Sequence, residues 1–345
     1  MSALLELRER VPLAPLTTLG VGGPADFYVR AATPSMVAAA ARFAASRALP
    51  VLVLGGGSNL VVSDDGFRGL VLHVDVRGRE LRSEGGATLV RMGAGESWDA
   101  LVAWATEQGL AGIECLAGIP GSVGATPVQN VGAYGQEVSD AVVAVETADL
   151  ASGEIARLSN RDCGFGYRNS RFKQTGGRVI LSVTYRLSAD VRPAPGYPEL
   201  QRQLAARGPG TPTLAEVRAA VLEIRRRKSM LVDPDSPDSR SVGSFFTNPI
   251  VPEALLARLG ADAPGFATPA GFKVPAAWLI EQAGFARGHT RGRVGLSRHH
   301  ALAIVNRGGA TAAEVIGLAR ELRDGVRERF GITLQPEPTL VGIAL

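Results

Sequence analysis

The fold of this chain is decided by one stretch, Gly118-Ile119-Pro120-Gly121-Ser122-Val123-Gly124-Ala125, and by its continuation Asn130-Val131-Gly132-Ala133-Tyr134-Gly135. Glycine is too frequent here for a helix or strand interior, where each one costs roughly 0.5–1 kcal/mol relative to alanine. Glycines let backbone N–H groups lie close against a flat or anionic group, as in phosphate-binding nests. Tight turns alone are the alternative, but the glycine density persists over the 18 positions from Gly118 to Gly135. The stretch therefore predicts a cofactor-binding loop.

Composition indicates a globular protein of two or three domains. The chain has 345 residues, of which 46% are hydrophobic and 20% charged, as in ordinary globular proteins. No apolar run reaches the length of about 18 residues that a membrane span needs. Residues 1–10 carry charges where a signal peptide has its apolar segment. We expect a cytoplasmic protein with no membrane partner.

Neither a metal site nor nucleic-acid binding is expected. The two cysteines, Cys115 and Cys163, match no metal or redox spacing. The close pair His299-His300 occupies adjacent positions, which do not face one another on a helix. The net charge is only +4, and the arginines are scattered apart from the basic run at 225–228. Nucleic-acid-binding proteins normally cluster basic and aromatic residues on one face, so an anionic small substrate fits the charge better.

Local patterns predict an alternation of strands and helices. Ser or Thr precedes the predicted helices at 34–47, 98–109 and 214–228. Another helix begins at Pro275, and a last one follows Thr311, where Glu314 completes a capping box. Strands are predicted at 27–29, 51–54, 70–74, 87–90, 141–145 and 178–187. The polar, proline-rich segment 233–239 indicates an exposed loop or linker.

Two further glycine motifs match neither common nucleotide site. Residues 20–25 fit the letters of the Rossmann fingerprint, but a strand-like segment follows where the fingerprint needs a helix. Residues 55–59, Gly-Gly-Gly-Ser-Asn, lack the Gly-Lys-Ser/Thr of a P-loop. They remain candidates for a phosphate nest. Three such loops in the first 135 residues suggest a different dinucleotide-binding architecture.

The order of these motifs resembles the UDP-N-acetylenolpyruvoylglucosamine reductase family, also called UDP-N-acetylmuramate dehydrogenases. The likeness spans about residues 15–342, nearly the whole chain. The segments that carry it, beside the opening stretch, are 18–23, 55–60, 167–173, 243–249 and 334–337. The resemblance implies an α+β fold, with a two-part FAD-binding region of the vanillyl-alcohol-oxidase-like (PCMH) type and a smaller α+β substrate domain. It implies FAD-binding subdomains at 1–72 and 73–229, a substrate-binding domain at 230–338 and a C-terminal strand at 339–345.

The resemblance also implies an activity. The family reduces the enolpyruvyl double bond of UDP-N-acetylglucosamine enolpyruvate to the lactyl ether of UDP-N-acetylmuramate, in peptidoglycan precursor synthesis. NADPH gives a hydride to FAD, which passes it to the substrate methylene carbon. By resemblance, Arg168 and Glu337 stabilise the enolate that develops, and Ser244 donates the final proton. An arginine fork suits this role because it holds a carboxylate in two places and opposes growing negative charge.

Binding residues are carried over in the same way. The cofactor-binding candidates are Gly55, Gly56, Gly57, Ser58, Asn59, Gly118, Ile119, Pro120, Gly121, Ser122, Gly124, Asn130, Gly132 and Ala133. Tyr197 corresponds to the loop tyrosine with which one subtype of the family covers the substrate. Tyr134, Asn248, Lys273 and His300 match further substrate positions. No metal is expected, and the protein is expected to be a monomer.

Some positions depart from the family pattern. Relatives have lysine where this chain has Thr247, glutamine where it has His300, and arginine where it has Thr339. The segment from 233 to 244 is longer by about two residues, which leaves Lys228 as the nearest counterpart of an expected lysine. Arg226 and Arg240 are alternative partners of the substrate diphosphate.

Two other functions stay open at this stage. A flavin-dependent sugar or alcohol oxidase of the same cofactor-binding superfamily would not need Ser244 or Glu337. A non-catalytic nucleotide-binding protein would bind flavin or nucleotide without turning over NADPH.

Overall fold

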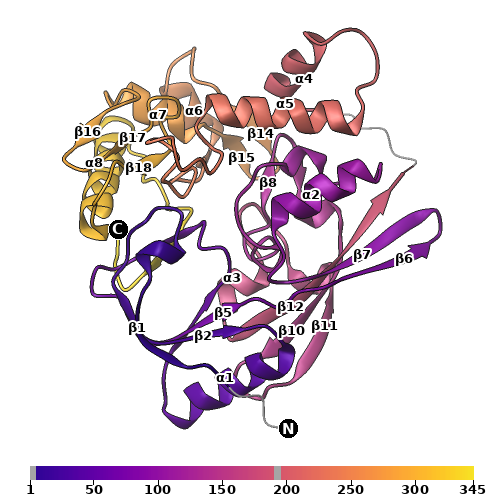
Figure 1. Ribbon diagram of the computed structural model, residues 1–345. Coiled ribbons are helices and arrows are strands. Elements are labelled where there is room, and N and C mark those ends of the chain that lie inside the picture. The colour runs from indigo at the N-terminus through magenta and orange to yellow at the C-terminus, as the bar shows by residue number, and fades with distance from the viewer. Residues whose placement is uncertain (1–4, 190–195) are drawn as a thin grey trace. The chain divides into compact units, whose positions relative to one another are not determined.

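The computed structural model describes residues 5–189 and 196–345, which form two compact units (Figure 1). The first unit contains residues 1–11, 25–56 and 68–227, as far as they are described. The second contains residues 12–24, 57–67 and 228–345. Among the helices of the described ranges, none is both long and apolar enough to cross a lipid bilayer.

Two sheets form the first unit. The smaller has the strand order β1-β2-β5-β3, in which β3 and β5 are parallel. The larger is fully antiparallel, with the order β11-β10-β12-β7-β6. A short hairpin, β8-β9, stands apart from both. The strands are β1 (Arg8–Pro12), β2 (Pro24–Ala31), β3 (Val51–Leu54), β5 (Phe67–Val74), β6 (Arg79–Glu84), β7 (Ala87–Gly93), β8 (Gly132–Ala133), β9 (Gln136–Glu137), β10 (Val142–Asp149), β11 (Ile155–Ser159) and β12 (Arg178–Ser188).

Helices pack against these sheets around one apolar core. The helices of this unit are α1 (Pro34–Ser46), α2 (Trp98–Glu107), α3 (Arg171–Thr175), α4 (Pro198–Ala205) and α5 (Leu214–Arg227). The core joins Val37 of α1, Trp98 of α2 and Val221 of α5 to the buried faces of β7, β10 and β12. The last two helices, α4 and α5, lie side by side (Figure 1).

The second unit has three small sheets and a long helix. Parallel β4 (Leu60–Val62) and β19 (Thr339–Val341) form one sheet. The others have the orders β13-β15-β14 and β16-β17-β18. Their strands are β13 (Ile250–Val251), β14 (Phe266–Thr268), β15 (Gly271–Lys273), β16 (Thr290–Arg291), β17 (Val294–Leu296) and β18 (Ile304–Asn306), and the helices are α6 (Glu253–Arg258), α7 (Ala276–Gln282) and α8 (Ala312–Phe330).

Segments distant in sequence hold this second unit together. Leu19, Val21 and Val61 enter the same apolar core as Phe245 and the buried face of α8. The Asp64 carboxylate accepts the N–H groups of Ala312 and Ala313 at 2.8 and 3.0 Å. The negative charge of this carboxylate also interacts favourably with the positive, N-terminal end of the α8 dipole.

The capping signals predicted from the sequence are confirmed. The hydroxyls of Thr33 and Ser97 accept N–H groups in the first turns of α1 and α2. Thr311 and Glu314 form the complete capping box of α8, which ends at left-handed Gly331. The strand predicted at 51–54 is β3, and residues 24–31 form β2. A strand therefore follows the glycines at 20–23, as expected for a segment that is not a Rossmann fingerprint.

Candidate functional site

Two glycine-rich loops of the first unit lie in direct contact. Gly55 and Gly56 follow the end of β3, and a Cβ added to Gly56 would lie 2.7 Å from Gly121 Cα. A Cβ added to Gly55 would lie 2.5 Å from Ser122 Oγ. Carbon atoms in contact are ordinarily about 3.5–4.0 Å apart, so Gly56, which meets backbone atoms, takes no side chain unless the loops move apart. At Gly55 the Ser122 hydroxyl would have to rotate away. The fold therefore brings together these four residues from the predicted cofactor set.

These loops present backbone N–H groups that the protein itself does not use. The N–H groups of Gly55, Gly56, Gly121 and Ser122 donate to no acceptor in the described part of the chain. Neighbouring N–H groups of this kind are the donors that a diphosphate needs. The residues present therefore fit the FAD predicted from the sequence.

The rest of the first stretch is fixed by its neighbours. Gly118 has a φ of 71°, which favours glycine, and its N–H donates to Asp99 Oδ1 at 2.6 Å. Ile119 and Pro120 are half-buried between the two glycines. A Cβ added to Gly124 would lie 2.5 Å from Ala94 Cβ. The backbone of this loop is therefore held in place by contacts that other residue types would disturb.

The side chain of Asn130 braces the second part of the stretch. Asn130 is 1% exposed, with a φ of 46°. Its Nδ2 donates to Glu137 Oε2 at 2.7 Å and to the Gly166 carbonyl oxygen at 3.2 Å, and its Oδ1 accepts the Ser139 N–H at 3.1 Å. Both atoms of the amide are thus engaged within the protein.

Tyr134 occupies a position that seldom suits an aromatic residue. It joins Gly132–Ala133 of β8 to β9 in a two-residue hairpin turn, with φ of 51° at Tyr134 and 85° at Gly135. Such turns need positive φ at both positions and strongly prefer Asn-Gly or Gly-Gly. Residues held in this way cluster at functional sites.

The second tyrosine of the candidate substrate set meets the first. Tyr197 directly precedes α4, and its ring contacts the Tyr134 ring edge-on, with centroids 5.5 Å apart and planes at 89°. Tyr134 is half-buried and Tyr197 is 41% exposed. Burial raises the pKa of both phenols, that of Tyr134 to about 12.

Arg168 is bound to the same hairpin. Its Nη2 donates to the Gly132 carbonyl oxygen at 2.6 Å, and its φ is 51°. A Cβ added to Gly132 would lie 3.0 Å from Arg168 Nη1, so glycine leaves the room that the guanidinium occupies. Asn130, Tyr134 and Arg168 are three of the six non-glycine residues with positive φ in the described part of the chain. This concentration of unusual backbone marks the β8-β9 hairpin as the centre of the candidate site in the first unit.

In the second unit, Asn59 and Glu337 lie next to each other. Asn59 Nδ2 donates to the Glu337 carbonyl oxygen at 3.4 Å, and the Asn59 carbonyl oxygen accepts the Thr339 N–H at 3.0 Å. The Ser58 carbonyl oxygen faces Thr18 Oγ1 at 3.5 Å. Gly57 has a φ of 61°, and a Cβ there would overlap the Leu16 carbonyl oxygen. The predicted cofactor residues 57–59 and the predicted catalytic Glu337 therefore share one small region.

Ser244 belongs to the same part of this unit. The Glu337 N–H donates to the carbonyl oxygen of Phe245, the residue after Ser244, at 2.9 Å. Phe245 and Phe246 are fully buried and in ring contact, which anchors the segment. Ser244 Oγ lies 3.4 Å from His300 Nε2. Ser244, His300 and the backbone of Glu337 thus lie close together in this unit.

The remaining substrate candidates are arranged around α7. Asn248 Oδ1 accepts the N–H of Ala276, the first residue of α7, at 2.9 Å. Lys273 is half-buried in β15, opposite Ile250 and Phe266. Asn248 therefore has a structural role at the helix start as well as its predicted role at the substrate.

The sequence did not single out two residues that contact the candidate loops. Arg225 is only 5% exposed and hydrogen-bonds the Tyr134 side chain. Asp99 receives the Gly118 N–H and lies 3.5 Å from Arg218 of α5. Both Arg218 and Arg225 project from α5. The signal for Arg225 in the sequence is its position on the apolar helix face that it shares with Val221 and Ile224.

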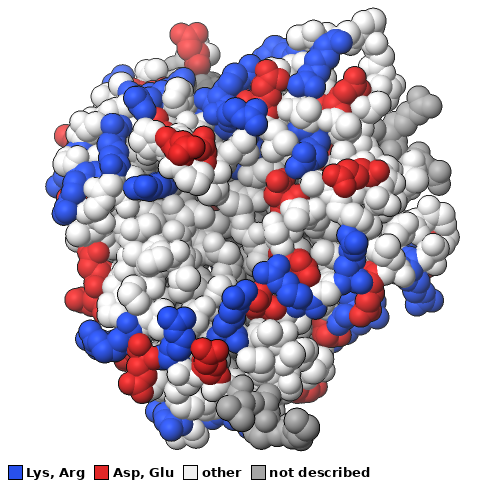
Figure 2. Space-filling view, viewed as in Figure 1, with Lys and Arg blue, Asp and Glu red and all other residues white. Residues whose placement is uncertain are grey.

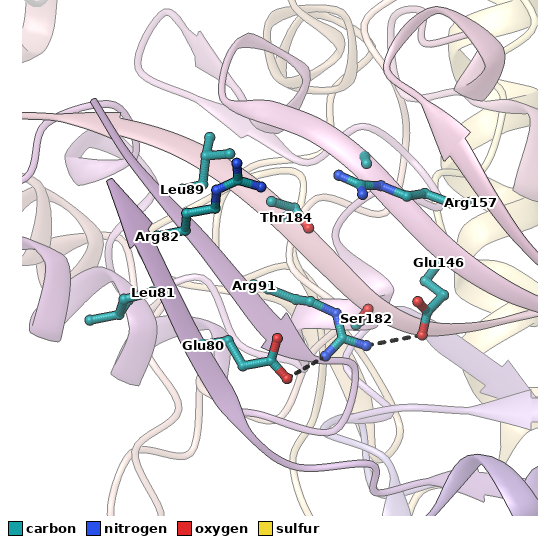
Figure 3. Close-up of a pocket in the computed structure, with 10 residues that line it drawn as sticks. Glu80, Leu81, Arg82, Leu89, Arg91, Glu146, Arg157, Ser182 and Thr184 are labelled. Carbon is teal, nitrogen blue, oxygen red and sulfur yellow. Dashed lines mark hydrogen bonds and ion pairs between the residues drawn. The ribbon is translucent and has the colours of Figure 1, made fainter. Parts of the chain in front are cut away.

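A surface pocket lies elsewhere. It has a volume of about 250 Å³ and opens on the face of the large sheet (Figure 3). Arg91 bridges Glu80 and Glu146 across it, at 2.9 and 3.0 Å. None of the predicted site residues lines it. Basic and acidic side chains are also interspersed over the face of the molecule shown in Figure 2.

Comparison with known proteins assigns the two parts of the chain. The FAD-binding domain model matches residues 25–159. The C-terminal domain model of UDP-N-acetylenolpyruvoylglucosamine reductase matches residues 235–341. The chain is 48% identical to the reductase of that name from Streptomyces coelicolor, over 97% of this chain and 90% of the relative. It is 47% identical to the one from Thermobifida fusca, over 98% of each chain.

A solved structure agrees with these relatives. The crystal structure of UDP-N-acetylenolpyruvylglucosamine reductase from Thermus caldophilus matches with a TM-score of 0.69 and 27% identity, over 98% of this chain and 99% of that one. The α+β fold class with an FAD-binding region, predicted above, is confirmed. The curated relatives favour the reductase reading over the oxidase alternative. This chain belongs to the UDP-N-acetylenolpyruvoylglucosamine reductase family.

Proposed function

We propose that this chain catalyses the NADPH-dependent, FAD-mediated reduction of UDP-N-acetylglucosamine enolpyruvate to UDP-N-acetylmuramate, a step of peptidoglycan precursor synthesis. The full-length likeness to curated reductases carries the proposal. The contact between the two glycine loops supports it, because their unused N–H groups suit a dinucleotide.

When bound, FAD supplies the redox chemistry, accepting a hydride from NADPH and passing it to the methylene carbon of the substrate. The proposed holders of FAD are residues 55–59, 118–122, Gly124, Asn130, Gly132 and Ala133. Gly56 and Gly121 contribute by their lack of side chains, and Asn130 by bracing the hairpin. The protein thereby keeps the reacting groups in place and out of water.

The substrate develops negative charge next to its carboxylate during the reaction. We assign the stabilisation of this charge to Arg168 and Glu337, and the delivery of the final proton to Ser244. The Arg168 side chain is oriented by its bond to Gly132, so its donors are held in advance of the reaction. A glutamate in such a role needs to carry or share a proton, because two unprotonated carboxylates would repel each other. A serine hydroxyl is a weak acid, which suits a strongly basic carbanion when geometry is favourable.

Tyr134, Tyr197, Asn248, Lys273 and His300 are proposed to bind the sugar nucleotide. The proposed organisation has FAD-binding parts at 1–72 and 73–229, a substrate-binding part at 230–338 and a last strand at 339–345. We further propose that the protein acts as a monomer in the cytoplasm, where the substrate and NADPH are present.

Substrate-dependent oxidation of NADPH tests the function. Purified protein with its flavin is mixed with NADPH, with and without UDP-N-acetylglucosamine enolpyruvate, in the absence of oxygen. Oxidation of NADPH is expected only when the substrate is present. A flavin-loaded protein whose NADPH oxidation is unaffected by the substrate would contradict the proposed function.

A further inference from the structure

The last turn of α5 carries an arginine in an unusual environment. Arg225 begins the basic run Arg225-Arg226-Arg227-Lys228, in which its two arginine neighbours are exposed. Arg225 itself is 5% exposed, and burial is the main cause that lowers the pKa of its guanidinium. Burying a charged group is unfavourable unless hydrogen bonds compensate for lost water. The Arg225 position therefore calls for a role that an exposed arginine could not fill.

The Tyr134 phenol is one of the groups that Arg225 holds. The two side chains are hydrogen-bonded, and the Arg225 charge acts to lower the pKa of a phenol that burial raises. Tyr134 sits in a turn that prefers Asn-Gly or Gly-Gly, so its own backbone preference does not keep it there. A charge-assisted hydrogen bond is about twice as strong as a neutral one. Arg225 thus helps to hold an aromatic side chain where local sequence preference would not.

The same helix also supports the second tyrosine. Tyr197 precedes α4, and α4 packs on α5. The rings of Tyr134 and Tyr197 are in edge-on contact at 5.5 Å. One helix therefore fixes Tyr134 through a side chain and Tyr197 through a neighbouring helix.

We propose that Arg225 is a positioning residue for Tyr134 and Tyr197, the two tyrosines assigned to substrate binding. Arg225 holds the Tyr134 phenol by a hydrogen bond. Through the contact of the two rings, it also fixes the position at which Tyr197 contacts the sugar nucleotide. This rests on the proposed function, since the two tyrosines are there assigned to substrate binding. Arg225 itself does not touch the substrate. Its loss is expected to weaken substrate binding more than the chemical step.

A double-mutant cycle tests this role. Arg225→Met removes the donors while a flexible apolar chain fills the space, and Tyr134→Phe removes only the hydroxyl. Each is expected to raise the KM for UDP-N-acetylglucosamine enolpyruvate about tenfold, the effect of losing a hydrogen bond to a charged group, with a much smaller change in kcat. Because both remove the same interaction, the double variant is expected to be no worse than Arg225→Met alone.

Controls separate positioning from general stability. Arg227→Met makes the same charge change at an exposed neighbour and is expected to leave KM unchanged. Arg225→Lys keeps a charged donor and is expected to restore part of the lost affinity. FAD content and Tm are measured for every variant. Should Arg225→Met fail to fold, Arg225→Gln, which removes the charge and shortens the side chain, replaces it in the cycle.

Two results would overturn the proposal. One is a double variant whose rise in KM is the product of the two single effects, which would mean that the residues act independently. The other is an Arg225→Met protein with a lower Tm but wild-type KM. Failure of the proposed function would look different, because wild-type protein would then show no substrate-dependent oxidation of NADPH.

Discussion

Replacement of Gly56 by alanine tests how closely the two cofactor loops approach. The added Cβ would lie 2.7 Å from Gly121 Cα, 3.1 Å from its carbonyl carbon and 3.2 Å from Ser122 N. The first distance is about 1 Å shorter than the 3.5–4.0 Å at which carbon atoms attract each other. All three atoms belong to backbone, so no side chain can rotate away, and the loops must separate by roughly this amount.

Overpacking of this kind typically destabilises a protein by about 1–3 kcal/mol. The separation would also displace the unused N–H groups of Gly121 and Ser122, which are proposed to hold FAD. We therefore expect Gly56→Ala to lower the free energy of unfolding by about 1–3 kcal/mol and to purify with less bound FAD than the wild type.

The assay measures flavin absorbance per protein after purification, FAD affinity by titration of the apoprotein, and unfolding in urea. Gly166→Ala is the matched control, because a Cβ there meets no atom within 4 Å and the backbone is not left-handed. The control is expected to behave like the wild type. If Gly56→Ala keeps the same FAD affinity and stability as Gly166→Ala, the reasoning about the loop contact is wrong.

Three further predictions concern catalysis and stability. In Ser244→Ala, NADPH is expected to bleach the flavin as in the wild type, while reoxidation of the flavin by the substrate becomes very slow. Stopped-flow absorbance measures both steps, and equal slowing of the two would exclude Ser244 as the proton donor. Thr311→Ala removes the cap of α8 and is expected to reduce stability by about 1 kcal/mol, with urea unfolding as the measurement and an unchanged midpoint as the contrary result. The pKa of His73 is lowered from its usual value of 6.5, first by burial and then by the Arg30 charge, so the folded state disfavours the proton. The stability that His73 contributes is present above pH 6.5 and lost as pH falls through the folded pKa. Urea unfolding at several pH values should therefore show that acidification lowers the free energy of unfolding less in His73→Gln than in the wild type. An identical pH dependence in the two proteins would refute this role of His73.

Local signals in the sequence predicted most helix starts correctly. Thr33, Ser97 and Thr311 each precede a helix and cap it in the structure, because capping depends only on residues within one turn. Strand β6 was not predicted, since all six of its residues are exposed and it lacks the apolar alternation that marks a strand.

Long-range arrangements could not be predicted from local pattern. Leu19 and Val61 pack in the same core as Phe245, more than 180 residues away in the chain, and no local property encodes such a pairing. The burial of Arg225 was missed for a related reason. A run of four basic residues normally indicates a solvated surface, and only the helix face shared with Val221 and Ile224 distinguishes the first of them.

The catalytic candidates came from motif order rather than from chemistry alone. Arg168, Ser244 and Glu337 are ordinary residue types, and each would pass for a surface or turn residue by itself. The structure adds a physical reason for Arg168, whose left-handed backbone and bond to Gly132 are unexpected for a surface arginine. The structure also places His300 beside Ser244. His300 is one of the positions at which the chain departs from the family pattern.

The most direct test of the account is the oxidative half-reaction. The flavin of the purified protein is reduced with a stoichiometric amount of NADPH under anaerobic conditions, and UDP-N-acetylglucosamine enolpyruvate is then added. We expect the flavin spectrum to return to its oxidised form as UDP-N-acetylmuramate appears in equal amount. A flavin that stays reduced until oxygen is admitted would contradict the central claim that this chain is a reductase of the enolpyruvyl ether.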